Sequence, residues 1–309
     1  MPSLILHHYP ASPFSEKVRL ILGAKGLEWR SVIVPAILPK PDVVALTGGY
    51  RRTPFLQIGA DVYCDTALIG RVLDGLAPRP PLYPVATQGL AEIVAQWADS
   101  SLFWIAVPFT MQPVSVPYMF PDATPESLQA FAADRAAMTP NLRRATLADA
   151  AAQLQGYFGR LENLLADGRP FLMGGESSIA DFSVVQSLWY MRRSPPIAKV
   201  LEGFPGLGAW YERVTAFGHG TSHEMRSAEA IGVAAGAASH APTVVEAAPG
   251  LAAGDEVTVT PTDYAHDPVA GRLIGLVRDE VVIERVDERA GRVHVHFPRV
   301  GFQVKKAAR

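Results

Sequence analysis

The sequence predicts three regions in succession: an α+β domain, an all-α helical bundle domain and a small C-terminal β-barrel-like domain. Strand-like and helix-like segments alternate as far as residue 78, strand patterns are then missing from 86 to 233, and period-two alternation returns from 255. The length of 309 residues, about twice that of a typical domain, agrees with several domains. We therefore expect domains at 1–80, 86–233 and 250–309.

The first region is expected to form a small mixed sheet with helices. "LILHHY" is a predicted strand, and "SPFSEKVRLILGAKG" is a helix with an apolar face. "WRSVIV", "TPFLQI" and "DVYC" are predicted strands, and "DTALIGRVLDGL" is a second helix. The order β-α-β, then β-β-α, is typical of a layered α+β structure. Residues 37–50, rich in Pro and Gly, predict a loop with a short irregular helix.

The other two regions differ in their periodicity. The second holds four long helical patterns broken by prolines and glycines, which favours an all-α domain. Residues 230–254 are rich in Ala, Gly and Pro and predict a linker with a frayed helical start. The last region shows five short alternating segments separated by Gly and Asp, which predicts a small, partly closed barrel.

Composition narrows the function classes. Hydrophobic residues make up 49% and charged residues 19%, and the net charge is -2, so we expect no nucleic-acid or acidic-membrane partner. No apolar run approaches the roughly 20 residues of a membrane span, and no secretory leader is evident. The single cysteine, Cys64, excludes an intramolecular disulfide and fits a reducing, cytoplasmic setting. As the end of a buried strand, its thiol is expected to be inert.

Three local features could carry chemistry, and each also has a plain structural interpretation. In "ASPFSEKVR", Ser12 can cap a helix whose first turn holds Pro13. In "RRTPFLQI", Pro54 removes a ladder donor at a strand entrance, as an ordinary edge proline also would. In "DTALIGRVL", Asp65 and Thr66 open a helix, where Asp65 can be simply its N-cap.

With these three features in this order, residues 3–225 resemble the glutathione S-transferase family, and the strand-rich tail lies outside the resemblance. It implies a thioredoxin-like first domain, an all-helical second domain, and glutathione as co-substrate without a metal. It also implies a cytoplasmic homodimer that transfers alkyl or aryl groups to glutathione in detoxification. The capping box formed by Ser178 and Asp181 after a "GGE" turn is a familiar signature of the family's second domain.

The resemblance implies a catalytic hydroxyl at the first strand–helix junction. Ser12 would face the glutathione sulfur and stabilise thiolate over thiol, with help from the positive helix end. Ser15 is the rival hydroxyl, and Tyr9 is a weaker one.

The resemblance also assigns the glutathione-binding residues. Pro54 would be cis, so that the backbone of Thr53 pairs with the cysteinyl unit, although the family usually has Val or Ile at this position. Asp65 and Thr66 stand for the usual Glu-Ser pair and would receive the γ-glutamyl end. Lys40 and Arg52 are candidates for the glycine carboxylate, and each could equally be an ordinary solvated charge.

A pocket for an electrophilic substrate is expected where aromatic residues concentrate, although such residues are more often plain core. The candidates are Phe14, Phe103, Trp104, Phe109 and Met111, with Tyr118 nearby.

Two questions stay open. His294, His296 and His266 could suggest a metal site, but no Cys or acid cluster at ligand spacing accompanies them. We therefore expect a solvated strand face and no metal. The family fold also supports other functions: glutathione-dependent isomerisation, reduction or dehalogenation, or a non-catalytic binding or stress protein whose tail recruits a partner.

Overall fold

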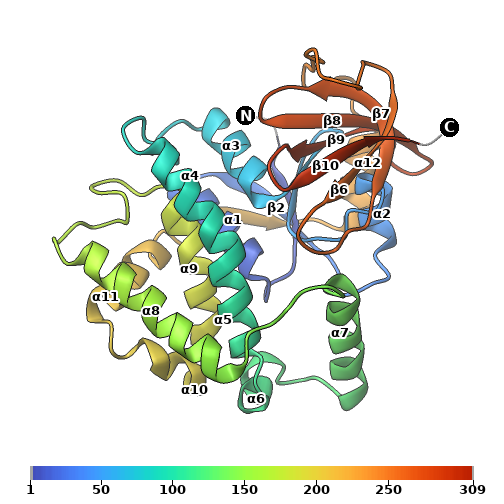
Figure 1. Ribbon diagram of the computed structural model, residues 1–309. Coiled ribbons are helices and arrows are strands. Elements are labelled where there is room, and N and C mark those ends of the chain that lie inside the picture. Colours follow the sequence, from blue (N-terminus) through green and yellow to red (C-terminus); the bar gives the residue numbers. More distant parts are fainter. Residues whose placement is uncertain (1–2, 308–309) are drawn as a thin grey trace.

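Strands from the two ends of the chain form one sheet in the computed structural model, which describes residues 3–307. Its ten strands lie in the order β10-β6-β7-β8-β9-β4-β3-β1-β2-β5. The strands are β1 (Ile5–His8), β2 (Glu28–Ile33), β3 (Phe55–Ile58), β4 (Asp61–Cys64), β5 (Thr221–Glu224), β6 (Glu256–Pro261), β7 (Val269–Leu276), β8 (Glu280–Asp287), β9 (Gly291–Pro298) and β10 (Phe302–Lys306). Figure 1 shows the tail strands, orange to red, gathered beside α2 (Pro41–Thr47) and β2 of the first region.

The first region has the predicted order of elements. Strand β1 pairs parallel with β2 and antiparallel with β3, and β3 pairs antiparallel with β4. Three helices complete it: α1 (Pro13–Ala24), α2 (Pro41–Thr47) and α3 (Thr66–Leu76). Helix α1 begins where the sequence indicates, with Ser12 as N-cap and a proline in the first turn.

The second region is helical throughout its described elements. Helix α9 lies at its centre, packs against α1, α4, α5 and α11, and is buried on nearly all sides. The elements are α4 (Gln88–Trp97), the π-helix η1 (Ala98–Leu102), α5 (Phe103–Thr110), η2 (Pro113–Ser115), α6 (Val116–Met119), α7 (Pro125–Met138), α8 (Leu147–Leu165), α9 (Ile179–Arg192), α10 (Pro195–Ala198), η3 (Lys199–Leu201) and α11 (Pro205–Thr215).

The predicted capping box at the start of α9 is confirmed. The Asp181 carboxylate accepts hydrogen bonds from the Ser178 amide at 2.8 Å, the Leu172 amide at 2.8 Å and the Trp210 indole at 2.8 Å. Burial raises the pKa of the Asp181 carboxyl, although the hydrogen bonds from these donors act to lower it. One buried carboxylate thus joins the start of α9 to α11 and to the preceding loop.

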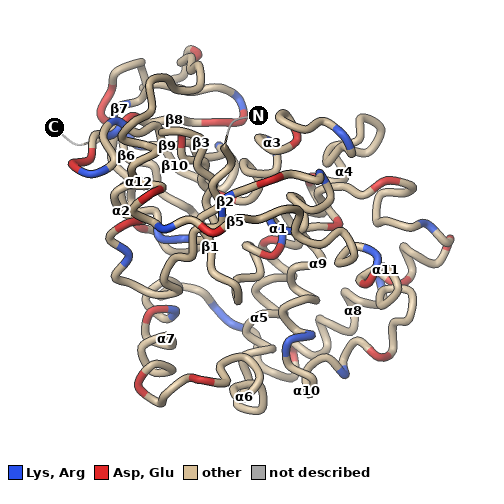
Figure 2. Tube along the Cα trace, turned by 180° about the vertical axis from the view of Figure 1, so that it is seen from behind, with Lys and Arg blue, Asp and Glu red and all other residues tan. Residues whose placement is uncertain are grey.

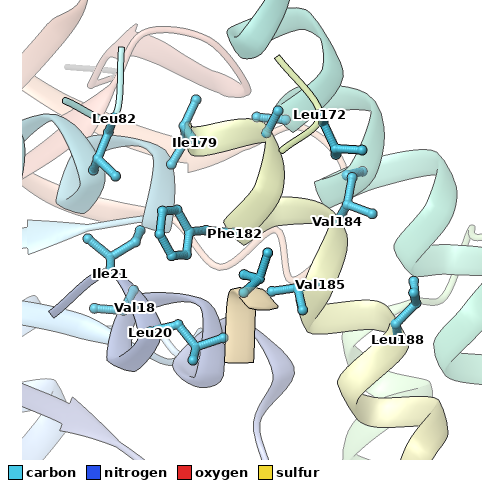
Figure 3. Packing of buried hydrophobic residues seen from close by; sticks show 14 of the residues in the cluster. Val18, Leu20, Ile21, Leu82, Leu172, Ile179, Phe182, Val184, Val185 and Leu188 are labelled. Carbon is cyan, nitrogen blue, oxygen red and sulfur yellow. The ribbon is translucent and has the colours of Figure 1, made fainter. Parts of the chain in front are cut away.

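Period-two alternation divides the first-region strands between two cores. Leu4, Leu6 and Leu56 belong to the cluster shared with the helical region. Ile5 and Phe55, on the opposite face, belong to the cluster shared with the tail. Figure 3 shows the first cluster, where Ile21 of α1 lies close to Phe182 of α9. The sheet is therefore covered on both faces.

The segment expected to be a linker contains a packed helix, α12 (Ser227–Ala235). Ala230, Ile231 and Ala234 are buried, and Gln57 donates its side-chain amide to the Ala230 carbonyl at 2.8 Å. Small side chains let this helix approach α2 and β9 closely. The predicted helical start is therefore present over residues 230–235, but this helix is packed against the sheet and α2 rather than frayed.

The five predicted tail strands are present, and they continue the first-region sheet. Strand β9 pairs parallel with β4, with Asp61 opposite His294 and Tyr63 opposite His296. The rings of Phe297 in β9 and Phe302 in β10 lie 5.5 Å apart, although three strands lie between β9 and β10 in the sheet, so the tail sheet curls toward closure.

The expectation of a solvated histidine face in the tail is wrong. His294 is 8% exposed and His296 is 2% exposed, because β4 lies beside their strand and Tyr63 packs on His296 with ring centroids 4.4 Å apart. The inert-thiol prediction holds, since Cys64 is fully buried and burial raises its pKa well above the ordinary value.

Lys and Arg lie among Asp and Glu along the whole described trace, so the small net charge is not the sum of two oppositely charged halves (Figure 2). Within residues 3–307, none of the helices is both long enough and apolar enough to span a membrane.

Candidate active site

A cavity of about 470 Å³ lies where all three regions meet. The first region contributes Phe14, Arg52, Thr53, Pro54, Asp65 and Thr66, all of them candidates from the sequence. The helical region contributes Asp99, and the tail contributes the loop 262–264 and part of the loop after β9. The structure therefore brings most of the predicted first-region residues to one site, and the tail forms one wall of it.

Ser12 stands at the N-terminus of α1, as the cap interpretation requires. Its Oγ accepts a hydrogen bond from the Ser15 amide at 3.1 Å, and its side chain is buried. That bond leaves the Ser12 hydroxyl proton available to another acceptor. Ser15 is fully enclosed, and its Oγ has no hydrogen-bond partner among the described residues.

The Thr53–Pro54 peptide bond is cis, as predicted. Both residues line the cavity. The Thr53 hydroxyl oxygen accepts a hydrogen bond from Lys40 Nζ at 3.3 Å, and the same ammonium donates to the Arg51 carbonyl at 3.2 Å. Lys40 is buried, and burial lowers its pKa to about 8, so its interpretation as a solvated charge is wrong.

Asp65 opens α3 with a backbone φ of 75°, which is uncommon for a residue other than glycine. Its carboxylate accepts a hydrogen bond from the Ala67 amide at 2.9 Å. The unusual φ and the cap together fix the first turn of α3, where the Thr66 side chain lies against the cavity.

The ion pair between Lys17 and Asp99 holds the Thr66 side chain in place. Lys17 of α1 is fully buried, and its Nζ lies 3.0 Å from Thr66 Oγ1 and 2.6 Å from Asp99 Oδ2. Asp99, in the π-helix η1, also accepts from Gln186 at 2.6 Å and Ser183 at 3.3 Å. Burial raises the pKa of Asp99, and the Lys17 charge opposes that shift.

Sequence reasoning missed both members of this pair. The available signal was Lys17 itself, which follows Phe14 at i+3 and precedes Ile21 at i+4 on the apolar side of α1. A lysine in that position needs a buried partner. Asp99 had no comparable signal, because its place depends on the packing of η1 against α9.

The tail engages Arg52 directly. The guanidinium pairs with the Asp263 carboxylate and donates to the Tyr264 carbonyl, and it lies 3.7 Å from the Tyr264 ring centroid. Arg52 is buried, so its interpretation as a solvated charge is also wrong. A cation held by a carboxylate and an aromatic face is strongly fixed in place.

Aromatic rings continue from the cavity into the helical region. Phe14 packs on Phe103 at 4.6 Å, Phe103 on Trp104 at 5.0 Å, and Trp104 on Tyr264 at 5.0 Å. The other two pocket candidates lie in different surroundings. Phe109 packs against the helical core, and the Met111 sulfur accepts a hydrogen bond from the Tyr190 hydroxyl at 3.2 Å.

Comparison with known families gives two matches along the chain. Residues 6–81 match the model of the glutathione S-transferase N-terminal domain, and residues 140–213 match that of the C-terminal domain. No curated protein sequence matches the chain.

One solved structure resembles the chain over nearly its full length, and others resemble about two thirds of it. A GST-like protein from Pseudomonas syringae has 42% identity and a TM-score of 0.84, covering 99% of this chain and 100% of that one. A glutathione S-transferase from Rhodospirillum rubrum has 21% identity and a TM-score of 0.52, covering 69% of this chain and 88% of its own. A rice GST in complex with glutathione has 20% identity and a TM-score of 0.51, with the same coverage. The last two support the fold alone.

Proposed function

Because this chain belongs to the glutathione S-transferase family, we propose that it is a glutathione transferase that ionises the glutathione thiol and presents it to a small electrophile. The observation that carries the proposal is the convergence of Thr53, Asp65 and Thr66 on one cavity. A cytoplasmic homodimer with a role in detoxification, and domains at 1–80, 86–233 and 250–309, belong to the same proposal.

Binding of glutathione would use the first-region wall. The γ-glutamyl carboxylate would meet the Thr66 hydroxyl and the first amides of α3, while the Asp65 carboxylate attracts the α-amino group. The backbone of Thr53 would pair with the cysteinyl unit. Because Lys17 Nζ already donates toward Thr66 Oγ1, the hydroxyl proton of Thr66 is left to point at the ligand.

The glycine end would lie toward Arg52 and Lys40. Arg52 already contacts Asp263 and Tyr264, so a glycine carboxylate would have to share this cation with the tail. This arrangement makes the tail loop part of the glutathione site in our proposal.

The chemical step would depend on Ser12. A hydrogen bond from its hydroxyl to the sulfur stabilises the thiolate, and the positive end of α1 acts in the same direction. The thiolate then attacks an electrophile held near Phe14, Phe103 and Trp104, where proximity lowers the barrier. The new C–S bond replaces the bond to the leaving group, which for an aryl halide departs as halide ion. Isomerisation, reduction or dehalogenation would use the same thiolate.

The alternative is a non-catalytic glutathione-binding protein, and two observations favour it. The Ser12 side chain is only 2% exposed, and Arg52 is already paired within the chain. Both leave fewer free groups for a substrate than an open site would have.

Turnover measurements with Ser12→Ala distinguish these functions. With glutathione and an aryl halide, we expect at least a tenfold loss of kcat with nearly unchanged glutathione affinity by calorimetry, since one hydrogen bond to a charged group contributes about 1.5–3 kcal/mol. Ser15→Ala is the matched control and should keep its activity. Unchanged turnover in Ser12→Ala would contradict the catalytic role of Ser12. Absence of glutathione binding to the wild type at millimolar concentration would contradict the proposed function itself.

A further inference from the structure

We propose that Asp61, His240 and His294 form a binding site for a divalent transition metal, with zinc as the best match, at the junction of the first region and the tail. The Asp61 Oδ1 atom lies 3.6 Å from His294 Nδ1 and 3.9 Å from His240 Nδ1. One ligand atom from each residue lies within 4.8 Å of the others. None of the three lines the cavity described above.

The two histidines present unsatisfied nitrogen atoms to the same carboxylate. Nδ1 of His240 and Nδ1 of His294 are both buried and lack a hydrogen-bond partner among the residues described. Buried polar side-chain atoms nearly always have a partner in a folded protein. Two imidazole nitrogens beside one carboxylate oxygen, with no other partner among the described residues, are a donor set that a cation can accept.

The donor set fits zinc chemistry. Zinc takes imidazole nitrogen and carboxylate oxygen at about 2.0–2.2 Å in a tetrahedron, which places ligand atoms roughly 3.3–3.5 Å apart. The observed separations of 3.6 and 3.9 Å exceed this only slightly. Three protein ligands leave the fourth position to water, as in open zinc sites.

One rearrangement is required. The rings of His240 and His294 are stacked, with centroids 3.7 Å apart and planes at 19°, so both cannot point their nitrogens at one ion in this pose. His240 lies in the irregular segment after α12, whereas His294 lies within β9. Binding therefore turns the His240 ring while His294 keeps its place.

Neighbouring groups orient the fixed ligands. Glu284 Oε2 lies 3.6 Å from Nε2 of His294, on the side opposite its unpartnered nitrogen, where a carboxylate commonly orients a metal-binding histidine. Asp61 Oδ2 accepts from the Ala241 amide at 2.9 Å, and Oδ1 accepts from His296 Nε2 at 3.0 Å. The carboxylate is thus held by the residue that follows His240 and by the strand that carries His294.

The three ligands come from β4, from the segment after α12 and from β9. Asp61 and His294 face each other in the β4–β9 register that joins the tail to the rest of the sheet. A bound ion therefore fastens the tail to the first region and stabilises the folded chain.

Calorimetric titration of the full chain with zinc, after chelator treatment and removal of the chelator, tests the proposal. We expect one zinc ion per chain, and at least tenfold weaker binding in His240→Ala and in His294→Ala. His266→Ala removes an exposed histidine outside the cluster and is the matched control, which should bind as the wild type does. Cobalt added to the stripped wild type should give visible absorption that His240→Ala lacks.

Measurement of Tm with and without zinc distinguishes binding at this site from nonspecific binding of zinc to the protein surface. Zinc at 100 times its Kd should raise the ratio of folded to unfolded chain about 100-fold and shift Tm upward in the wild type and in His266→Ala. In His240→Ala the same zinc concentration should raise Tm by no more than about half as much. If His294→Ala fails to fold, His240→Ala, whose side chain is 19% exposed, decides the matter. Zinc affinity of His240→Ala within tenfold of the wild-type affinity, or absence of zinc binding from the wild type, overturns the proposal.

Discussion

Replacing Lys17 by Met tests the buried support of the candidate site. The change removes the ammonium that lies 2.6 Å from Asp99 and 3.0 Å from Thr66 while keeping most of the side-chain volume. Removing one partner of a buried pair costs about 3–5 kcal/mol. Asp99 is 21% exposed and keeps its bonds from Gln186 and Ser183, so we expect the lower end, about 3 kcal/mol.

The loss should depend on pH in a definite direction. Burial raises the pKa of Asp99, and Lys17 opposes the shift, so removal of Lys17 raises that pKa further. An acid whose folded pKa lies above its unfolded value of about 3.9 gives stability below that value and loses it as pH rises through the folded pKa. The deficit of Lys17→Met relative to wild type should therefore shrink from pH 8 toward pH 4.

Urea unfolding, followed by tryptophan fluorescence and far-UV circular dichroism at several pH values, measures the effect. Lys306→Met removes a half-exposed lysine that pairs with Asp255 at 2.8 Å, and it should cost at most about 1 kcal/mol. A Lys17→Met variant within 0.5 kcal/mol of wild type at pH 8, or a deficit that grows at acid pH, refutes the reasoning.

Two further substitutions probe the tail contact and the helical core. Tyr264→Ala removes the ring 3.7 Å from the Arg52 guanidinium and should cost about 1–2 kcal/mol in urea unfolding, whereas Tyr118→Ala, at an exposed tyrosine, should cost less than 0.5 kcal/mol. Equal effects of the two would argue against the contact. Asp181→Ala leaves four buried donors without their acceptor, namely two backbone amides, the Ser178 hydroxyl and the Trp210 indole, and should lower stability by about 3 kcal/mol or more. A neutral result in the same assay contradicts the bonding described.

Local signals in the sequence were sufficient for much of the fold. Ser12, Asp65 and Ser178 each mark a helix start through a side chain that reaches only a few residues along the chain, and all three helices begin there. Period-two alternation likewise indicated the tail strands. These features depend on short-range geometry, which a single sequence contains.

Features that depend on distant packing could not be predicted in this way. The residues "DVYC" do not indicate that β4 lies in the interior of a sheet, because its second neighbouring strand, β9, is more than 200 residues away along the chain. The burial of His294, and the pairing of Arg52 with Asp263, follow from that docking. For the same reason the helical start of residues 230–254 was predicted to be frayed, although α12 is packed, since its small side chains allow a close approach to β9 that the local sequence does not show.

The most direct test of the central claim is an experimental structure of the full chain with reduced glutathione. We expect the tripeptide in the cavity, with its sulfur within hydrogen-bond distance of Ser12 Oγ and its γ-glutamyl carboxylate on the Thr66 hydroxyl. A cavity that stays empty at millimolar glutathione, or a sulfur whose nearest donor is Ser15 or Tyr9, would contradict it.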